Sequence, residues 1–208
     1  MHRYMGIFLI AVFALIAAGV CPPASWADQA ATASIEQTFQ KARQEYLDKN
    51  MTSAAEQIQK GAAYMKDQAS KASAKGKDAL AASARELDQL AVDVKKGAVT
   101  SQKKMEDAFA RAYLALANDA HIQSTESWAK KKRVEAAAAL ETANRNLEKS
   151  IAWTGGKIEK GTNEVVKKSD ALALKLKQKG DLLADDVSRG LQEAGSEIEK
   201  FGKKISPR

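Results

Sequence analysis

The feature that most constrains this chain is a segment that occurs twice. Residues 46–65 align with residues 128–147 at a constant separation of 82 positions (128 − 46 = 82). The matched pairs are Tyr46 with Trp128, Ala54 with Ala136, Ala55 with Ala137, Ile58 with Leu140 and Met65 with Leu147. Because each pair keeps its size and polarity class, the repeat predicts a duplicated helical hairpin.

A second, shorter echo follows at a different separation. Residues 88–94 align with residues 181–187 at a separation of 93 (183 − 90 = 93). The slip between the two separations is 11 (93 − 82 = 11), which is about three α-helical turns. An insertion of that length keeps the buried face of a helix in register. We therefore expect eleven extra residues in the second copy, near Gly155 and Gly156, where the adjacent glycines predict a hinge or kink that ends the second hairpin.

The first 27 residues have the pattern of a secretory signal peptide. Arg3 precedes an apolar run at residues 7–20, and Ser25-Trp26-Ala27 supplies small residues at the recognition positions. We expect cleavage after Ala27 and an exported, periplasmic protein. Lipidation at Cys21 is disfavoured, because Val20 stands where that processing requires a small residue.

Composition without this leader excludes several classes of site. Residues 28–208 contain no cysteine, one histidine (His121) and one proline (Pro207), so neither disulfides nor thiolate metal sites can form. A long body rich in Ala, Lys, Glu and Leu and free of proline is typical of α-helical proteins. We expect an all-α fold and a single domain.

The chain is basic, with a formal net charge of +7, or +6 without Arg3. For an exported protein, anionic lipid headgroups and acidic glycans are better matched counter-charges than nucleic acid, and we expect no nucleic-acid partner. Because charges of both signs are interspersed, the favoured interpretation is a mixed, solvated helix surface.

Helix signals divide the chain into four parts. We expect a signal peptide at 1–27, a helical hairpin at 28–97, a second hairpin at 98–156 and one long amphipathic helix at 157–208. In the first hairpin the turn falls at residues 48–50, and the second helix runs from Thr52 to Gly97 with a bend or fraying near Gly76. The last helix carries an eleven-residue apolar repeat, namely Val165, Leu176, Val187 and Ile198, and likewise Leu172, Leu183, Ala194 and Ile205.

The whole is predicted to be an elongated antiparallel helical bundle, with coiled-coil-like seams of small residues between its helices.

One helix face combines the titratable and aromatic side chains that could hold a ligand. Tyr113, His121 and Trp128 recur on one side of the third predicted helix. They form a candidate ligand face. The alternative is a half-buried histidine that hydrogen-bonds a neighbouring helix. A metal site needs several converging ligands, and here only carboxylates could join His121, so we expect no metal and no cofactor.

A basic cluster follows the third helix. Lys130, Lys131, Lys132 and Arg133 occupy the second copy of the hairpin turn, next to Trp128. They are candidate contacts for an anionic surface, and the alternative is a solvated turn. The first copy has Asp48 and Asn50 at the matching positions, so the turn itself does not require cations.

No nucleophile–base pair is visible in the sequence, and we expect a non-catalytic protein. The favoured function is an interaction or envelope-stress scaffold that binds a protein partner, or itself, through helix faces. Two alternatives stay open. One is a small-ligand or metal-binding bundle centred on His121, and the other is reversible membrane-surface binding by residues 157–205.

Overall fold

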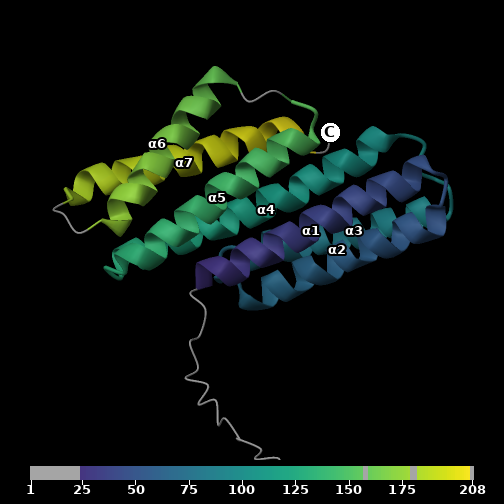
Figure 1. The fold of residues 1–208 in the computed structure, drawn as a ribbon, viewed down its shortest axis with the longest axis horizontal. Coiled ribbons are helices and arrows are strands. Elements are labelled where there is room, and N and C mark those ends of the chain that lie inside the picture. The colour runs from purple at the N-terminus through teal and green to yellow at the C-terminus, as the bar shows by residue number, and fades with distance from the viewer. Residues whose placement is uncertain (1–23, 157–158, 179–181, 207–208) are drawn as a thin grey trace, which may run out of the picture.

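The computed structural model describes residues 24–156, 159–178 and 182–206, with side chains from Ser34 onward. The described residues are helical, with no strand among them, and they form seven helices (Figure 1). Their bounds are α1 Ala24–Leu47, α2 Met51–Lys71, α3 Lys77–Lys95, α4 Gln102–Ala129, α5 Arg133–Trp153, α6 Lys160–Lys177 and α7 Ala184–Ile205. The predicted all-α helical bundle is confirmed.

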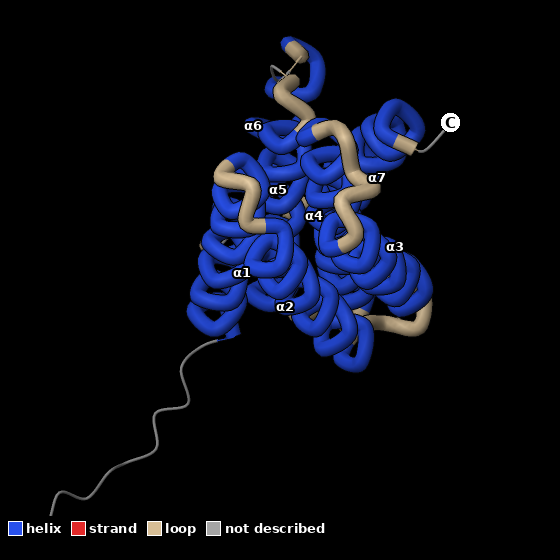
Figure 2. The backbone as a smooth tube through the Cα atoms, turned by 90° about the vertical axis from the view of Figure 1, so that its right-hand side faces the viewer, coloured by secondary structure: helices blue, strands red, loops and turns tan. Residues whose placement is uncertain are grey.

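Successive helices run antiparallel, and the bundle is stacked in tiers. Helices α1, α2 and α3 lie on one side, α4 and α5 in the middle, and α6 and α7 on the other side (Figures 1 and 2). Helix α4 packs against α1, α3, α5 and α7, so it contributes to every part of the interior.

The repeat seen in the sequence extends through the whole fold. Helices α5 and α7 begin 82 residues after α2 and α4, respectively. Helices α4, α5 and α6 end 82 residues after α1, α2 and α3, respectively. The repeating unit is therefore three helices, α1–α3 and then α4–α6, and α7 begins a third unit. The predicted alignment of residues 88–94 with residues 181–187 is wrong, because residues 88–94 lie inside α3 whereas residues 182 and 183 precede α7. No eleven-residue insertion separates the units.

The two hairpin turns at the centre of the repeat have the same backbone geometry. The amides of residues 48, 49 and 50 donate to the carbonyls of residues 44, 46 and 45. The amides of 130, 131 and 132 donate to the carbonyls of 126, 128 and 127, which are the equivalent positions. Lys49 and Lys131 both have positive φ, 65° and 58°. The predicted turn at 48–50 is confirmed, and its copy forms with quite different side chains.

The segment from 52 to 97 is two antiparallel helices, not one bent helix. The chain leaves α2 at Lys71 and reverses before α3 begins at Lys77. The Ser73 hydroxyl accepts a hydrogen bond from the Gly76 amide and donates to Asp119 of α4. Burial raises the pKa of the Asp119 carboxyl, although hydrogen bonds from Gln123 and Ser73 act to lower it. A side chain from another helix thus holds this reversal.

The C-terminal segment is likewise two helices, not one. Helix α6 ends at Lys177 and α7 begins at Ala184, and the two pack against each other at an angle (Figure 1).

Three glycines let α7 approach its neighbours closely. A Cβ at Gly190 would lie 2.7 Å from Leu172, one at Gly195 would lie 2.6 Å from His121, and one at Gly202 would lie 3.2 Å from Leu114. These glycines therefore mark contacts between helices.

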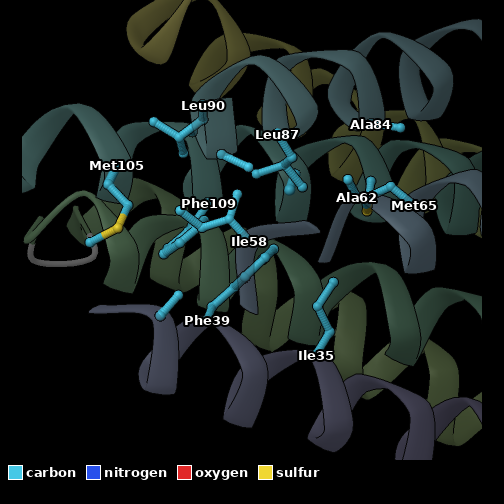
Figure 3. Packing of buried hydrophobic residues seen from close by; sticks show 14 of the residues in the cluster. Ile35, Phe39, Ile58, Ala62, Met65, Ala84, Leu87, Leu90, Met105 and Phe109 are labelled. Carbon is cyan, nitrogen blue, oxygen red and sulfur yellow. The ribbon is translucent and has the colours of Figure 1, made fainter. Parts of the chain in front are cut away.

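The interior contains a large cluster from α1–α4 and two smaller ones from α4–α7. Within the large cluster, Phe39 and Phe109 stack with ring centroids 4.1 Å apart (Figure 3). Trp153, at the end of α5, closes this cluster with edge contacts to both rings. All five residue pairs of the sequence repeat lie in the interior, with Trp128 half-buried and the others buried.

The seams of small residues predicted from the sequence are buried by this packing. Ala54, Ala55, Ala62, Ala136 and Ala137 are all buried between the protein's own helices. Of the eleven-residue stripes, Leu176, Val187, Ala194 and Ile198 are buried, whereas Leu183 is 73% exposed.

None of the described helices is long and apolar enough to cross a membrane. The predicted signal peptide, with Cys21, lies largely outside the described residues, and the predicted cleavage after Ala27 falls in the first turn of α1.

Candidate functional site

The three residues of the predicted ligand face lie in three different environments. Tyr113 is fully buried in the α1–α4 cluster, and its hydroxyl donates to Glu36 Oε2 at 2.7 Å. Burial, followed by the hydrogen bond to Glu36, raises the pKa of Tyr113 far above its ordinary value. Tyr113 is therefore a structural side chain that joins α4 to α1.

His121 is half-buried where α7 crosses α4. Its ring lies against Gly195, and Nε2 is 2.8 Å from the carbonyl oxygen of Leu191. Since a carbonyl only accepts, Nε2 carries the proton and donates. This is the alternative arrangement named for His121, a hydrogen bond to a neighbouring helix.

Trp128 packs on the cluster formed by α5, α6 and α7. Tyr113, His121 and Trp128 do not line any of the three hollows described below, which lie between α6 and α7, between α3 and α4, and between α3, α4 and α7. In the same described part of the chain, no three His, Cys, Asp or Glu side chains converge as a metal site would need. The geometry does not assemble the predicted face into one site.

The predicted basic cluster, by contrast, forms a protruding turn between α4 and α5. Lys130, Lys131 and Lys132 are exposed, and Lys132 pairs with Glu135 at 2.9 Å. The Arg133 guanidinium donates to the carbonyl oxygen of Gln178 at 2.9 Å, which joins this basic turn to the end of α6. Because residues 48–50 form the same backbone turn without this cluster, the four cations are not needed to make the turn.

Gln178 also lines an open cleft between α6 and α7 with a volume of about 740 Å³. Its lining is Lys168, Ala171, Leu172, Lys175, Gln178, Leu182, Leu183, Asp186, Val187, Arg189, Gly190 and Glu193. The basic turn and the α6–α7 cleft lie at the same end of the bundle (Figure 1), and we refer to them together as the basic end.

The repeat supplies an internal comparison for this cleft. The equivalent groove, between α3 and α4, has a volume of about 250 Å³, and all seven residues that line it map onto lining residues of the α6–α7 cleft when 82 is added. Four of them carry charge, and every sign is reversed. Glu86, Asp93, Lys104 and Arg111 correspond to Lys168, Lys175, Asp186 and Glu193.

The charge reversal is accompanied by a difference in pairing. In the α3–α4 groove, Glu86 pairs with Arg111 at 2.5 Å and Asp93 with Lys104 at 3.9 Å. In the part of the chain that the structure describes, neither Lys168 nor Lys175 pairs with a carboxylate, and Asp186 pairs with Arg189 of its own helix at 3.6 Å. The α6–α7 cleft has the larger volume of the two. Because Lys168 and Lys175 have no carboxylate partner among the described residues, both are available for an external anion.

A third hollow lies between α3, α4 and α7, with a volume of about 510 Å³. Half of its fourteen lining residues are apolar or glycine, namely Ala79, Ala82, Leu114, Ala115, Ile198, Gly202 and Ile205, and the other half are Ser83, Glu86, Arg111, Asn118, Glu199, Lys203 and Ser206. Arg111 spans one side, since it bonds Glu86 of α3 and the carbonyl oxygen of Ile205 in α7. Ser83 also lines this α3–α4–α7 pocket, and its buried hydroxyl has no hydrogen-bond partner among the described residues.

The sequence analysis identified the basic turn but did not predict any of the three hollows. The lysines of α6 have the spacing of residues on a solvated helix face. Lys168 and Lys175 line a cleft only because α7 packs beside α6. One sequence signal was available. Extending the alignment beyond residue 147 at the separation of 82 pairs the residues that line the α3–α4 groove with residues that line the α6–α7 cleft.

No known protein family, curated protein or solved structure matches this chain. The fold and the surfaces described above are therefore the basis for any functional assignment.

Proposed function

We propose that this chain is an exported, non-catalytic helical protein that binds anionic membrane surfaces reversibly through its basic end. The observation that carries the proposal is the gathering of exposed cations and an exposed leucine at one end of the bundle. The basic turn and the cleft lining together supply seven cations, against Asp186, Glu193 and the Glu135 partner of Lys132. This leaves an excess of four positive charges.

Leu183 supplies the apolar part of the contact. It is the most exposed large hydrophobic side chain among the described residues, at 73%, and it lines the same cleft as Lys168 and Lys175. An exposed leucine in a cleft that also carries lysines suits the interface of a bilayer, where the leucine side chain enters the acyl boundary and the ammonium groups meet phosphates.

The expected strength is modest. Each cation near an anionic leaflet contributes about 1 kcal/mol, so an excess of four contributes about 4 kcal/mol. Burying the exposed part of one leucine adds about 1.5 kcal/mol. The sum corresponds to a dissociation constant of about 10⁻⁴ M, which describes reversible and salt-sensitive association.

Binding of a protein partner through small-residue seams was the favoured expectation, and the structure leaves less surface for it. Those seams are filled by neighbouring helices of the same chain. Membrane binding needs no such face, because the cations and Leu183 are exposed in the folded protein.

The test is vesicle co-sedimentation with phosphatidylglycerol mixed equally with phosphatidylcholine, and with phosphatidylcholine alone. We expect binding to the anionic vesicles at low salt and little to the neutral ones. Replacing Lys130→Glu together with Lys131→Glu changes the charge by four, and should weaken binding at least a hundredfold. Leu183→Ser should weaken it severalfold with little change in its salt dependence.

The chain provides a matched control at the opposite end of the bundle. Lys95 and Lys96 are also consecutive exposed lysines before a turn, so Lys95→Glu with Lys96→Glu makes the same change in net charge. This control should retain most of the binding. If both double variants lose binding equally, net charge is responsible and the basic end is not the site. Absence of binding to anionic vesicles at low salt would refute the proposal.

A further inference from the structure

The α3–α4–α7 pocket has the features of a binding site for an uncharged, lipid-like molecule. Its volume of about 510 Å³ falls in the range of small-molecule sites, about 300–1,000 Å³. The space exists because small residues face it from three helices, namely Ala79 and Ala82 of α3, Ala115 of α4 and Gly202 of α7. The larger apolar side chains in the lining are Leu114, Ile198 and Ile205, and contact with them favours an apolar guest over water.

The charges around this pocket balance. The lining holds two carboxylates, Glu86 and Glu199, and two cations, Arg111 and Lys203. The guanidinium of Arg111 is already engaged by Glu86 and by the carbonyl oxygen of Ile205. A charged guest would therefore have to displace an existing ion pair, whereas a neutral one would not. The equal numbers of positive and negative charges distinguish this pocket from the basic end, where cations are in excess.

One buried hydroxyl in the lining lacks a hydrogen-bond partner among the described residues. Ser83 is 6% exposed, and its hydroxyl makes no hydrogen bond to any described residue. An unsatisfied buried hydroxyl is unfavourable, because it loses its bonds to water without replacing them. A guest with one hydroxyl or carbonyl group could satisfy it after a small adjustment of α3.

From this combination we infer that the α3–α4–α7 pocket binds an uncharged, mainly apolar molecule that bears a single hydrogen-bonding group, such as a long-chain alcohol. Ser83 bonds the polar group, Leu114, Ile198 and Ile205 surround the apolar part, and Arg111 closes one side. This inference does not depend on membrane binding by the basic end.

The test uses a neutral apolar fluorophore, N-phenyl-1-naphthylamine, with displacement by 1-decanol. We expect enhanced fluorescence with the purified protein, and displacement by 1-decanol at concentrations at least tenfold below those needed for decanoate. Displacement by decanoate at equal or lower concentration would overturn the assignment of a neutral guest.

Variants locate the site. Ala82 is exposed at the rim, so Ala82→Trp should fill the pocket, and the smaller Ala82→Leu should fill it in part. We expect at least a tenfold loss of dye affinity for the first and a smaller loss for the second. Ala63→Trp, on the exposed face of α2 and away from the pocket, is the matched control and should bind like the original protein. Circular dichroism establishes that each variant is folded.

Two further outcomes separate this site from others. Ser83→Ala should weaken the affinity for 1-decanol, measured by displacement and corrected for any change in dye affinity, about fivefold, since one hydrogen bond is lost. If Ala82→Trp and Ala82→Leu bind the dye normally while Leu183→Ser does not, the α6–α7 cleft is the apolar site and the inference is wrong.

Discussion

At the scale of single residues, polar side chains that join distant helices explain much of the architecture. Glu36 of α1 accepts hydrogen bonds from Gln40 and Tyr113, and lies 3.6 Å from the Lys149 ammonium of α5. Burial alone would raise the pKa of Glu36, but these partners outweigh it and hold the pKa below the ordinary value of 4.5.

Glu36 should therefore contribute to stability in a pH-dependent way. A carboxyl whose pKa is lower in the folded state stabilises the fold above pH 4.5, and the contribution is lost as the pH falls through the folded-state pKa. We expect Glu36→Gln to reduce the free energy of unfolding by about 2 kcal/mol at pH 7, and by progressively less as the pH falls below 4.5. Chemical denaturation at several pH values measures this difference.

Glu56, on the exposed face of α2, provides the control. Glu56→Gln should change the free energy of unfolding by less than about 0.5 kcal/mol at pH 7. A Glu36→Gln effect that stays constant from pH 7 to pH 3 would mean that the carboxylate charge is not what stabilises the α1–α4–α5 contact.

At the scale of secondary-structure elements, glycines determine how α7 is attached. Glycine weakens an isolated helix by up to about 1 kcal/mol relative to alanine, yet α7 carries three at contacts with α4 and α6. The cost is offset by close packing, because His121 of α4 fits against Gly195 and donates to the carbonyl oxygen of Leu191.

Gly195→Ala should therefore destabilise the protein in spite of its better helix propensity. A Cβ would lie 2.6 Å from the His121 ring, and relieving that overlap should lower the free energy of unfolding by about 1–3 kcal/mol. In a His121→Ala background the ring is absent, so the same substitution should be neutral or stabilising. A double-mutant cycle by urea denaturation measures this coupling.

Gly161 is the matched position, since nothing lies within 4 Å of a Cβ built there. Gly161→Ala should be neutral or stabilising by up to about 1 kcal/mol. If Gly195→Ala behaves like Gly161→Ala in the original background, close packing of α7 on His121 is not important for stability.

At the scale of the whole molecule, α4 and α5 connect two groups of helices. The α1–α4 cluster is closed by Trp153 of α5, whereas Ala136, Ala137 and Leu140 are covered by α6 and α7. The first group should therefore persist without the C-terminal helices, and the middle tier should not be fully buried.

Ending the chain after Thr154 tests this division. We expect the shortened protein to stay mainly helical by circular dichroism, because the α1–α4 cluster is complete. Its free energy of unfolding should fall by at least about 2 kcal/mol, and an apolar dye should bind the newly exposed face of α5. Unchanged stability would show that α6 and α7 are attached only weakly to the rest.

The sequence by itself determined the helices and the repeat. Residue periodicity places Ile58, Leu140, Met65 and Leu147 on buried faces, and the polar turn at 48–50 and the break at Gly155 fall where the chain indicates. These features are local, because apolar spacing, breakers and helix propensity act within a few residues. The basic turn was also readable, since four consecutive cations are visible without any fold.

Tertiary structure alone decided how the helices are joined and which surfaces result. The reversal after Lys71 depends on Asp119, some fifty residues away, and the cleft position of Lys168 depends on where α7 packs. Tyr113, His121 and Trp128 share a helical stripe, yet each meets a different set of helices. A periodic pattern specifies only that a face is buried. What that face contacts is set by long-range packing, which the spacing of residues in one helix does not contain.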